Sequence, residues 1–258
     1  MNNHEIDYKL YGDDMQFVEV ELDPDETVIA EAGALMMMDQ DIRMETIFGD
    51  GTNQGGFMGK LFGAGKRLLT GESLFMTTFT NVGTGKKHVS FAAPYPGKIV
   101  PMDLSEYDGK IICQKDSFLA AAKGVSVGIE FQRKIGTGFF GGEGFIMQKL
   151  EGDGMAFVHA GGTIIEKELQ AGDMLRVDTG CLVAMTKDVD YSIEFVKGVK
   201  TMLFGGEGLF FATLRGPGKV WVQSLPFSRL ASRVVAAIPG SKDEGSIAKG
   251  LFNIFDGD

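Results

Sequence analysis

The 258-residue sequence has few of the residues from which metal sites and catalytic centres are built. Its three histidines, His4, His88 and His159, form no His-x-His or His-x-x-x-His pair. A Gly-x-Ser-x-Gly motif is missing, and no cysteine and histidine pairing indicates an activated nucleophile. We therefore expect no metal, no cofactor and no catalytic residue, and the sequence favours a protein that is not an enzyme. His159 is expected to be a surface or capped residue rather than a ligand.

Cysteines and long apolar runs are also scarce. The two cysteines, Cys113 and Cys181, are typical of small buried apolar residues in a reducing compartment. No apolar run approaches the roughly 18 residues that a membrane-spanning helix needs. The first residues, MNNHE, lack the charged-then-apolar form of a signal peptide. Together these features predict a cytoplasmic protein.

Basic residues are too few to favour a phosphate-bearing partner. Asp and Glu number 35 against 25 Lys and Arg, so the formal net charge is −10 and a nucleic-acid backbone would be repelled. Segment 62–67 ends like a P-loop, but Lys60 occupies the place of the upstream glycine, and Arg67 that of the magnesium-binding Ser or Thr. We expect no nucleic acid and no nucleotide as partner.

What the chain has in excess is glycine, phenylalanine and methionine. The 37 Gly, 20 Phe and 14 Met, beside only 7 Pro, indicate short apolar strands joined by tight turns. The run Ala34–Met38 is read as one buried strand of this kind.

A Gly-Glu signature occurs three times, at residues 71–79, 142–150 and 206–214. Each copy begins a predicted hairpin module that turns at a glycine loop, near 71–97, 142–162 and 206–226. A second pattern, which contains Gly33-Ala34-Leu35, recurs 147 residues later as Gly180-Cys181-Leu182. We therefore predict a single all-β domain over 1–228, made of three circularly permuted repeats. Such repeats bury their apolar faces on one another, and the first and last pieces are expected to pair and close the chain.

Two segments depart from the repeat. The glycine-rich excursion 49–70 either packs locally or forms a flap that meets a partner chain or a membrane surface. The tail 229–258 starts with a short helical segment and continues as an apolar helical stripe, which docks on its own protein or on a partner or membrane. The candidate contact residues of the two segments are Phe57, Met58, Leu61, Phe62, Leu251 and Phe255.

Three glutamates, Glu72, Glu143 and Glu207, occupy the same place in each signature. A pseudo-threefold axis would relate them, so their carboxylates could hold a hard cation or another small ligand. The alternative is structural, with each glutamate accepting hydrogen bonds from the neighbouring repeat.

The Gly-Glu hairpins, the strand Asp178–Ala184 with its counterpart Glu31–Met36, and the segment Phe204–Phe210 carry a family resemblance. They resemble the bacterial branch of the altered-inheritance-of-mitochondria, or mitochondrial biogenesis, family over about residues 5–235. The resemblance implies a fold similar to the tryptophan RNA-binding attenuation protein group, a pseudo-threefold β-sandwich or double-stranded β-helix. It brings no catalytic residues, because the bacterial members have no assigned activity. Mitochondrial members are linked to inner-membrane organisation.

Two functional hypotheses follow from the sequence. The first is a non-enzymatic homo-oligomeric scaffold or binding module, which contacts a protein partner or lies near a membrane. The second is a small-ligand or cation-binding protein, or an unrecognised enzyme, that uses the repeated carboxylates.

Overall fold

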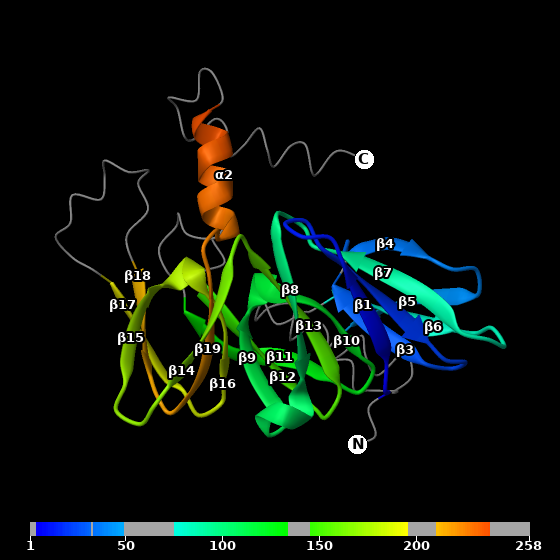
Figure 1. Cartoon of the computed structure of the whole chain (residues 1–258), viewed down its shortest axis with the longest axis horizontal. Coiled ribbons are helices and arrows are strands. Elements are labelled where there is room, and N and C mark those ends of the chain that lie inside the picture. Colours follow the sequence, from blue (N-terminus) through cyan, green and yellow to red (C-terminus); the bar gives the residue numbers. More distant parts are fainter. Residues whose placement is uncertain (1–3, 32, 49–74, 134–144, 196–209, 238–258) are drawn as a thin grey trace.

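The structure, a computed structural model, describes residues 4–31, 33–48, 75–133, 145–195 and 210–237. These residues form four antiparallel sheets, here named A to D, and one α-helix (Figure 1). The predicted all-β fold with a short helical segment near the C-terminus is confirmed.

Sheet A is formed by strands within residues 7–92, and sheet B by strands within residues 27–161. Sheet A has the order β1 (Asp7–Tyr11), β2 (Phe17–Leu22), β7 (Lys87–Ala92), β4 (Leu35–Met38). Sheet B has the order β5 (Ile42–Phe48), β6 (Phe75–Asn81), β3 (Thr27–Glu31), β10 (Phe118–Ala122), β13 (Met155–Gly161), β8 (Gly97–Asp103).

Sheets C and D are formed by strands within residues 110–223. Sheet C has the order β11 (Ser126–Arg133), β12 (Phe145–Glu151), β9 (Lys110–Gln114), β16 (Leu182–Thr186), β19 (Gly218–Gln223), β14 (Ile164–Leu169). Sheet D has the order β15 (Met174–Asp178), β18 (Phe210–Arg215), β17 (Asp190–Phe195). Short 3-10 turns lie at Leu104–Tyr107, Lys115–Ser117 and Thr179–Cys181.

The described strands form three consecutive units of six strands each. Unit 1 runs from β2 to β7, unit 2 from β8 to β13 and unit 3 from β14 to β19, while β1 is an addition at the edge of sheet A. Sheet B joins three strands of unit 1 to three strands of unit 2, and sheet C joins units 2 and 3 in the same way. Each junction is one strand pair, β3 with β10 and β9 with β16.

Three apolar cores lie between successive sheets. Alternation of side chains decides which core each strand fills, because successive residues point to opposite faces. In β2 the even positions Val18, Val20 and Leu22 are buried in the first core. The central strand β10 is buried on both faces, since Ala120 contributes to the first core and Ala121 to the second.

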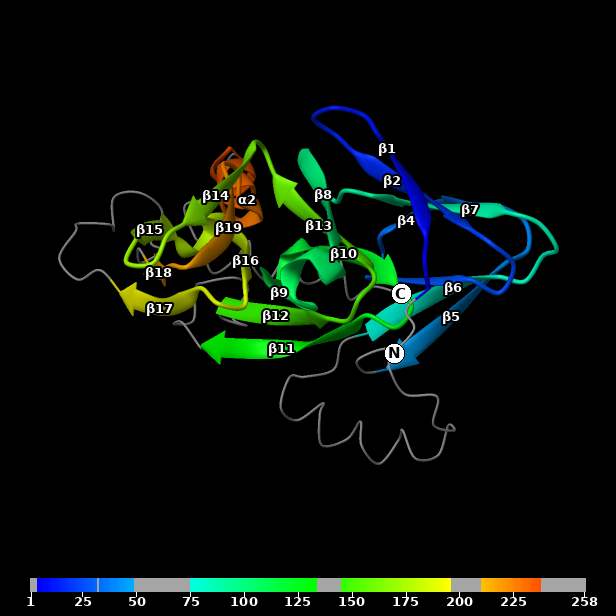
Figure 2. The ribbon, with the colours of Figure 1, turned by 60° about the horizontal axis from the view of Figure 1, so that its bottom comes forward.

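The described strands do not close into a ring within the chain. The first strands lie in sheet A and the hairpin around Gly218 joins sheets D and C, and no strand of sheet A pairs with either. Figure 1 shows sheet A and sheet D at opposite ends of the molecule, and the turned view in Figure 2 agrees. The expected pairing of the first and last pieces is therefore wrong for a single chain. The repeat was recognisable in the sequence. However, each junction adds the next unit at the far side of the previous one, so the first and last described strands stay apart.

Helix α2 (Phe227–Ala236) follows Pro226 and projects from the sheets (Figure 1). Its first turn is tied to the body by Arg229, whose guanidinium donates to the Ser224 carbonyl oxygen over 3.4 Å and lies 3.8 Å from Asp178 Oδ2. The Phe227 ring packs against Tyr95 with ring centres 5.4 Å apart. Further along the helix, Val234 is largely exposed.

Candidate functional site

The site residues expected from the sequence lie outside the described residues. This holds for the three repeated glutamates and for the candidate contact residues of the excursion and the tail: Glu72, Glu143, Glu207, Phe57, Met58, Leu61, Phe62, Leu251 and Phe255. The carboxylate site and the two contact segments therefore stay predictions. Within the described ranges, no group of three His, Cys, Asp or Glu side chains is placed to hold a metal ion.

Both cysteines are free thiols. Cys113 is fully buried, as expected, and burial raises the pKa of its thiol to about 12. Cys181 is only half-buried, and the Nη2 atom of Arg229 lies 3.7 Å from its sulfur. Burial, followed by the nearby Asp178, also raises the pKa of Cys181. Neither thiol has the lowered pKa that a nucleophilic cysteine needs.

His159 is buried rather than at the surface, with only 1% of its area exposed. It lies on β13, where its Nε2 is 3.1 Å from the Tyr95 carbonyl oxygen and its ring meets the Tyr95 ring edge-on at 4.4 Å. Because a carbonyl oxygen only accepts, Nε2 carries the proton, and the buried Nδ1 has no hydrogen-bond partner. Burial therefore lowers the pKa of His159 to about 4. Alternation along β13 gave no signal for this, because the strand is buried on both faces.

The depressed pKa of His159 predicts a pH-dependent stability. Its folded-state pKa of about 4 lies below the unfolded value, so the unfolded chain binds more protons between the two values and stability falls as pH falls. From pH 7 to pH 5 we expect this group to remove about 2 kcal/mol of the free energy of unfolding. Urea titrations of the natural protein and of His159→Gln at both pH values measure it. The glutamine variant should lack this loss, and equal losses in the two proteins would contradict the assignment.

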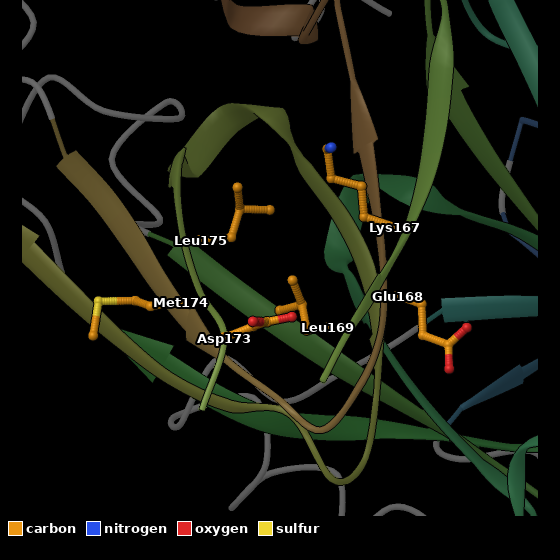
Figure 3. A pocket seen from close by; sticks show the side chains of 6 residues that line it. All are labelled: Lys167, Glu168, Leu169, Asp173, Met174 and Leu175. Atoms are coloured by element: carbon orange, nitrogen blue, oxygen red, sulfur yellow. The ribbon is translucent and has the colours of Figure 1, made fainter. Parts of the chain in front are cut away.

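A hollow of about 450 Å³ lies between β14 and β15. Figure 3 shows its lining, which comprises Lys167, Glu168, Leu169, Asp173, Met174 and Leu175. This lining contains neither histidine nor cysteine nor serine, so it lacks a nucleophile and base pair. The hollow is relevant because of its position: two of its residues, Met174 and Leu175, belong to β15, the edge strand of sheet D.

Strand β4 exposes three consecutive methionines at the edge of sheet A. The exposed fractions are 51% for Met36, 47% for Met37 and 44% for Met38. The expectation of a buried strand is therefore wrong for an isolated chain. The physical reason is position: β4 pairs with β7 on one side and with no described strand on the other. Apolar side chains on an unpaired sheet edge are a typical interaction surface.

Strand β15 is the second edge of this kind, at the far end of the row of sheets. Of the described strands, only β18 pairs with it, and Met174 at its start is largely exposed. Arg176 is also exposed, where its Nη2 forms an ion pair of 2.6 Å with Glu194 on β17. The two edges therefore differ in character, one being purely apolar and the other mixed.

Comparison with known proteins decides the family. The family model described as "Mitochondrial biogenesis AIM24" matches residues 8–225. The chain belongs to this family. A similar protein, an uncharacterised protein of Streptococcus pyogenes serotype M6, is 31% identical over 234 residues, which is 89% of this chain and 90% of that protein.

The crystal structure of another Streptococcus pyogenes protein, SPYM3_0169, shares the fold of this AIM24-family chain. Its TM-score is 0.71 at 24% identity, and the match covers 91% of this chain and all of that one. At this identity the likeness supports the fold alone. Among the described residues, no helix is both long enough and apolar enough to cross a bilayer.

Proposed function

We propose that this AIM24-family protein is a non-enzymatic scaffold or binding module that works as a homo-oligomer. The observation that carries the proposal is the run of three exposed methionines on the unpaired edge of sheet A. Methionine is flexible and polarizable, so a row of methionines adapts to another apolar surface. Water contact with this row is unfavourable, and a protein partner that covers it gains apolar burial.

The charge of the protein does not favour nucleic acid as an alternative partner. The net charge of −10 disfavours nucleic acid, so the proposed fold likeness to the tryptophan RNA-binding attenuation protein group does not extend to RNA. A position near a membrane remains part of the proposal through segment 49–70 and the tail. The cation-binding alternative rests on the three repeated glutamates, and no described residue favours it.

A lysine in the methionine edge should abolish the assembly. We expect the natural chain to sediment at micromolar concentration as an oligomer of the 27.9 kDa chain, and Met37→Lys to sediment as a single chain. The reason is that an edge lysine places a solvated charge where a partner strand would have to pack. Sedimentation velocity with light scattering measures both masses.

Met15→Lys is the matched control, because Met15 is equally apolar and 60% exposed but lies in the turn between β1 and β2. This variant should keep the oligomer. A natural chain of 27.9 kDa throughout the micromolar range would overturn the proposal, as would an equal loss of mass in the two lysine variants.

A further inference from the structure

The two edge strands, β4 and β15, correspond to the two partners of a strand pairing that the chain already forms twice between its units. At the first junction β10 of unit 2 pairs with β3 of unit 1, and at the second β16 of unit 3 pairs with β9 of unit 2. The strand that corresponds to β10 and β16 in unit 1 is β4, which has no such partner among the described strands. The strand that corresponds to β3 and β9 in unit 3 is β15, and no described strand pairs with it in this way either.

The residues of β4 can be matched one by one with those of β10 and β16 through the pairing registers of the three strands. All three strands carry a bulge at the same place in their pairing with the last strand of their own unit, which is β7, β13 or β19. Just after the bulge, Met37 pairs with Ser90, Ala120 with Phe157 and Ala184 with Trp221. Met37 therefore occupies the position of Ala120 and Ala184, which are both completely buried by their junctions.

The positions of β15 follow from the Gly-Glu hairpins in the same way. Counted from the signature glycines, Thr77, Gln148 and Ala212 are equivalent, and they pair with Ala30, Cys113 and Val177. At the existing junctions Ala30 pairs with Ala120, and Cys113 with Ala184. The missing pair of a third junction is thus Met37 with Val177, followed by Met38 with Arg176.

We infer that β15 of one copy pairs antiparallel with β4 of a second copy in this register, so that the sheets continue from chain to chain. The inference rests on the proposed function and names its interface and partner, a second copy of this chain. Because the two edges differ and lie at opposite ends of the molecule, the contact is head-to-tail (Figure 1). Successive copies then form a ring or a longer row.

The apolar cores support the same conclusion. The first core takes Leu119 and Ala120 from the following unit, and the second takes Val183 and Ala184. Within the part of the chain that the structure describes, no unit follows the third core, and Val177 at its border is only half-buried. The residues that would complete it are Met36 and Met37 of the next copy.

Side-chain volumes fit this arrangement. At the existing junctions a small alanine on β10 or β16 lies opposite a large aromatic residue, Phe157 or Trp221. At the free edge the sizes are exchanged, since the large Met37 lies opposite the small Ser90. The space at the third core can thus be filled by a side chain of β4 instead of by one of β7.

Disulfide trapping between two differently tagged chains tests the register. One chain carries Met37→Cys and the other Val177→Cys, both with Cys181→Ser, while the fully buried Cys113 is kept. Directly opposite residues on antiparallel strands have Cβ atoms about 4.5–5.5 Å apart, close enough for a disulfide after a small adjustment. We expect the mixture to form a covalent dimer that contains both tags, and each variant alone to form little.

The matched control replaces Val177→Cys by Arg176→Cys, whose side chain points to the other face of β15. We expect its cross-linking with Met37→Cys to be at least about ten-fold slower, as opposite faces separate the two sulfurs. Equal rates, or efficient cross-linking of Met37→Cys with itself, would overturn the head-to-tail register.

Hydrogen exchange on the natural chain gives a second readout that needs no substitution. Backbone amides of residues 35–40 and 174–178 should gain protection together as the protein concentration rises, because both edges become paired. An oligomer without this protection and without the cross-link would refute the strand pairing but leave the scaffold proposal standing. A monomer at all concentrations would end both.

Discussion

Replacement of Trp221 by alanine should lower the free energy of unfolding by about 4 kcal/mol, the largest effect we expect from a single side chain. Trp221 lies on β19, is almost fully buried and belongs to the second core, where it bridges units 2 and 3. Its ring meets Tyr107 edge-on at 5.6 Å, and its Nε1–H donates to Glu166 Oε2 over 3.2 Å. Alanine would leave a cavity, which neighbouring strands in a continuous six-stranded sheet cannot collapse to fill.

Trp221→Phe is the control for this prediction. It keeps most of the apolar volume and loses the indole hydrogen bond, so we expect a loss of about 1–2 kcal/mol. Urea unfolding followed by circular dichroism measures both variants, at one protein concentration because self-association shifts apparent stability. A loss below that of the phenylalanine variant would show that Trp221 does not support the junction.

Alanine at Gly161 should destabilise the protein by about 3 kcal/mol, through a clash of main-chain atoms rather than a cavity. Gly161 ends β13 where the chain leaving β19 crosses it, and its carbonyl oxygen accepts from the Leu225 N–H over 3.1 Å. A Cβ atom there would lie 2.0 Å from the Leu225 carbonyl oxygen and 2.8 Å from the Tyr95 ring. Backbone cannot move aside as a flexible side chain can, so the crossing itself must shift.

Gly85→Ala is the matched control, since a Cβ at Gly85 meets no atom within 4 Å. This variant should change the free energy of unfolding by less than about 0.5 kcal/mol, as is usual for an exposed position. Thermal unfolding of the two variants side by side compares them. Similar transition temperatures for both would contradict the tight crossing at Leu225.

The repeat shows how far the sequence could be interpreted. The Gly-Glu signature and the 147-residue offset were visible as letters, because equivalent turns and core positions require the same residue types. The burial of Met36, Met37 and Met38 was predicted from an unbroken apolar run and is wrong for one chain, since their partner strand is not among the described strands of that chain.

The residues of the candidate edge were not recognisable as a site. Val177 and Arg176 carry no motif, and only the pairing of β3 with β10 and of β9 with β16 shows what β15 lacks. For His159, which was expected to be a surface or capped residue, the surface alternative is wrong for a related reason. Its neighbours in sequence could not show that Tyr95, 64 residues away, covers its ring.

By itself the sequence determined the β class, the threefold repetition and the glycine turns, because these depend on local propensity and on the period of apolar residues. Only the tertiary structure decided that the row of units stays open among the described strands, and therefore which of these strands have an unpaired edge. That decision depends on how each sheet passes from one unit to the next, a relation between segments far apart in the chain that no local pattern contains.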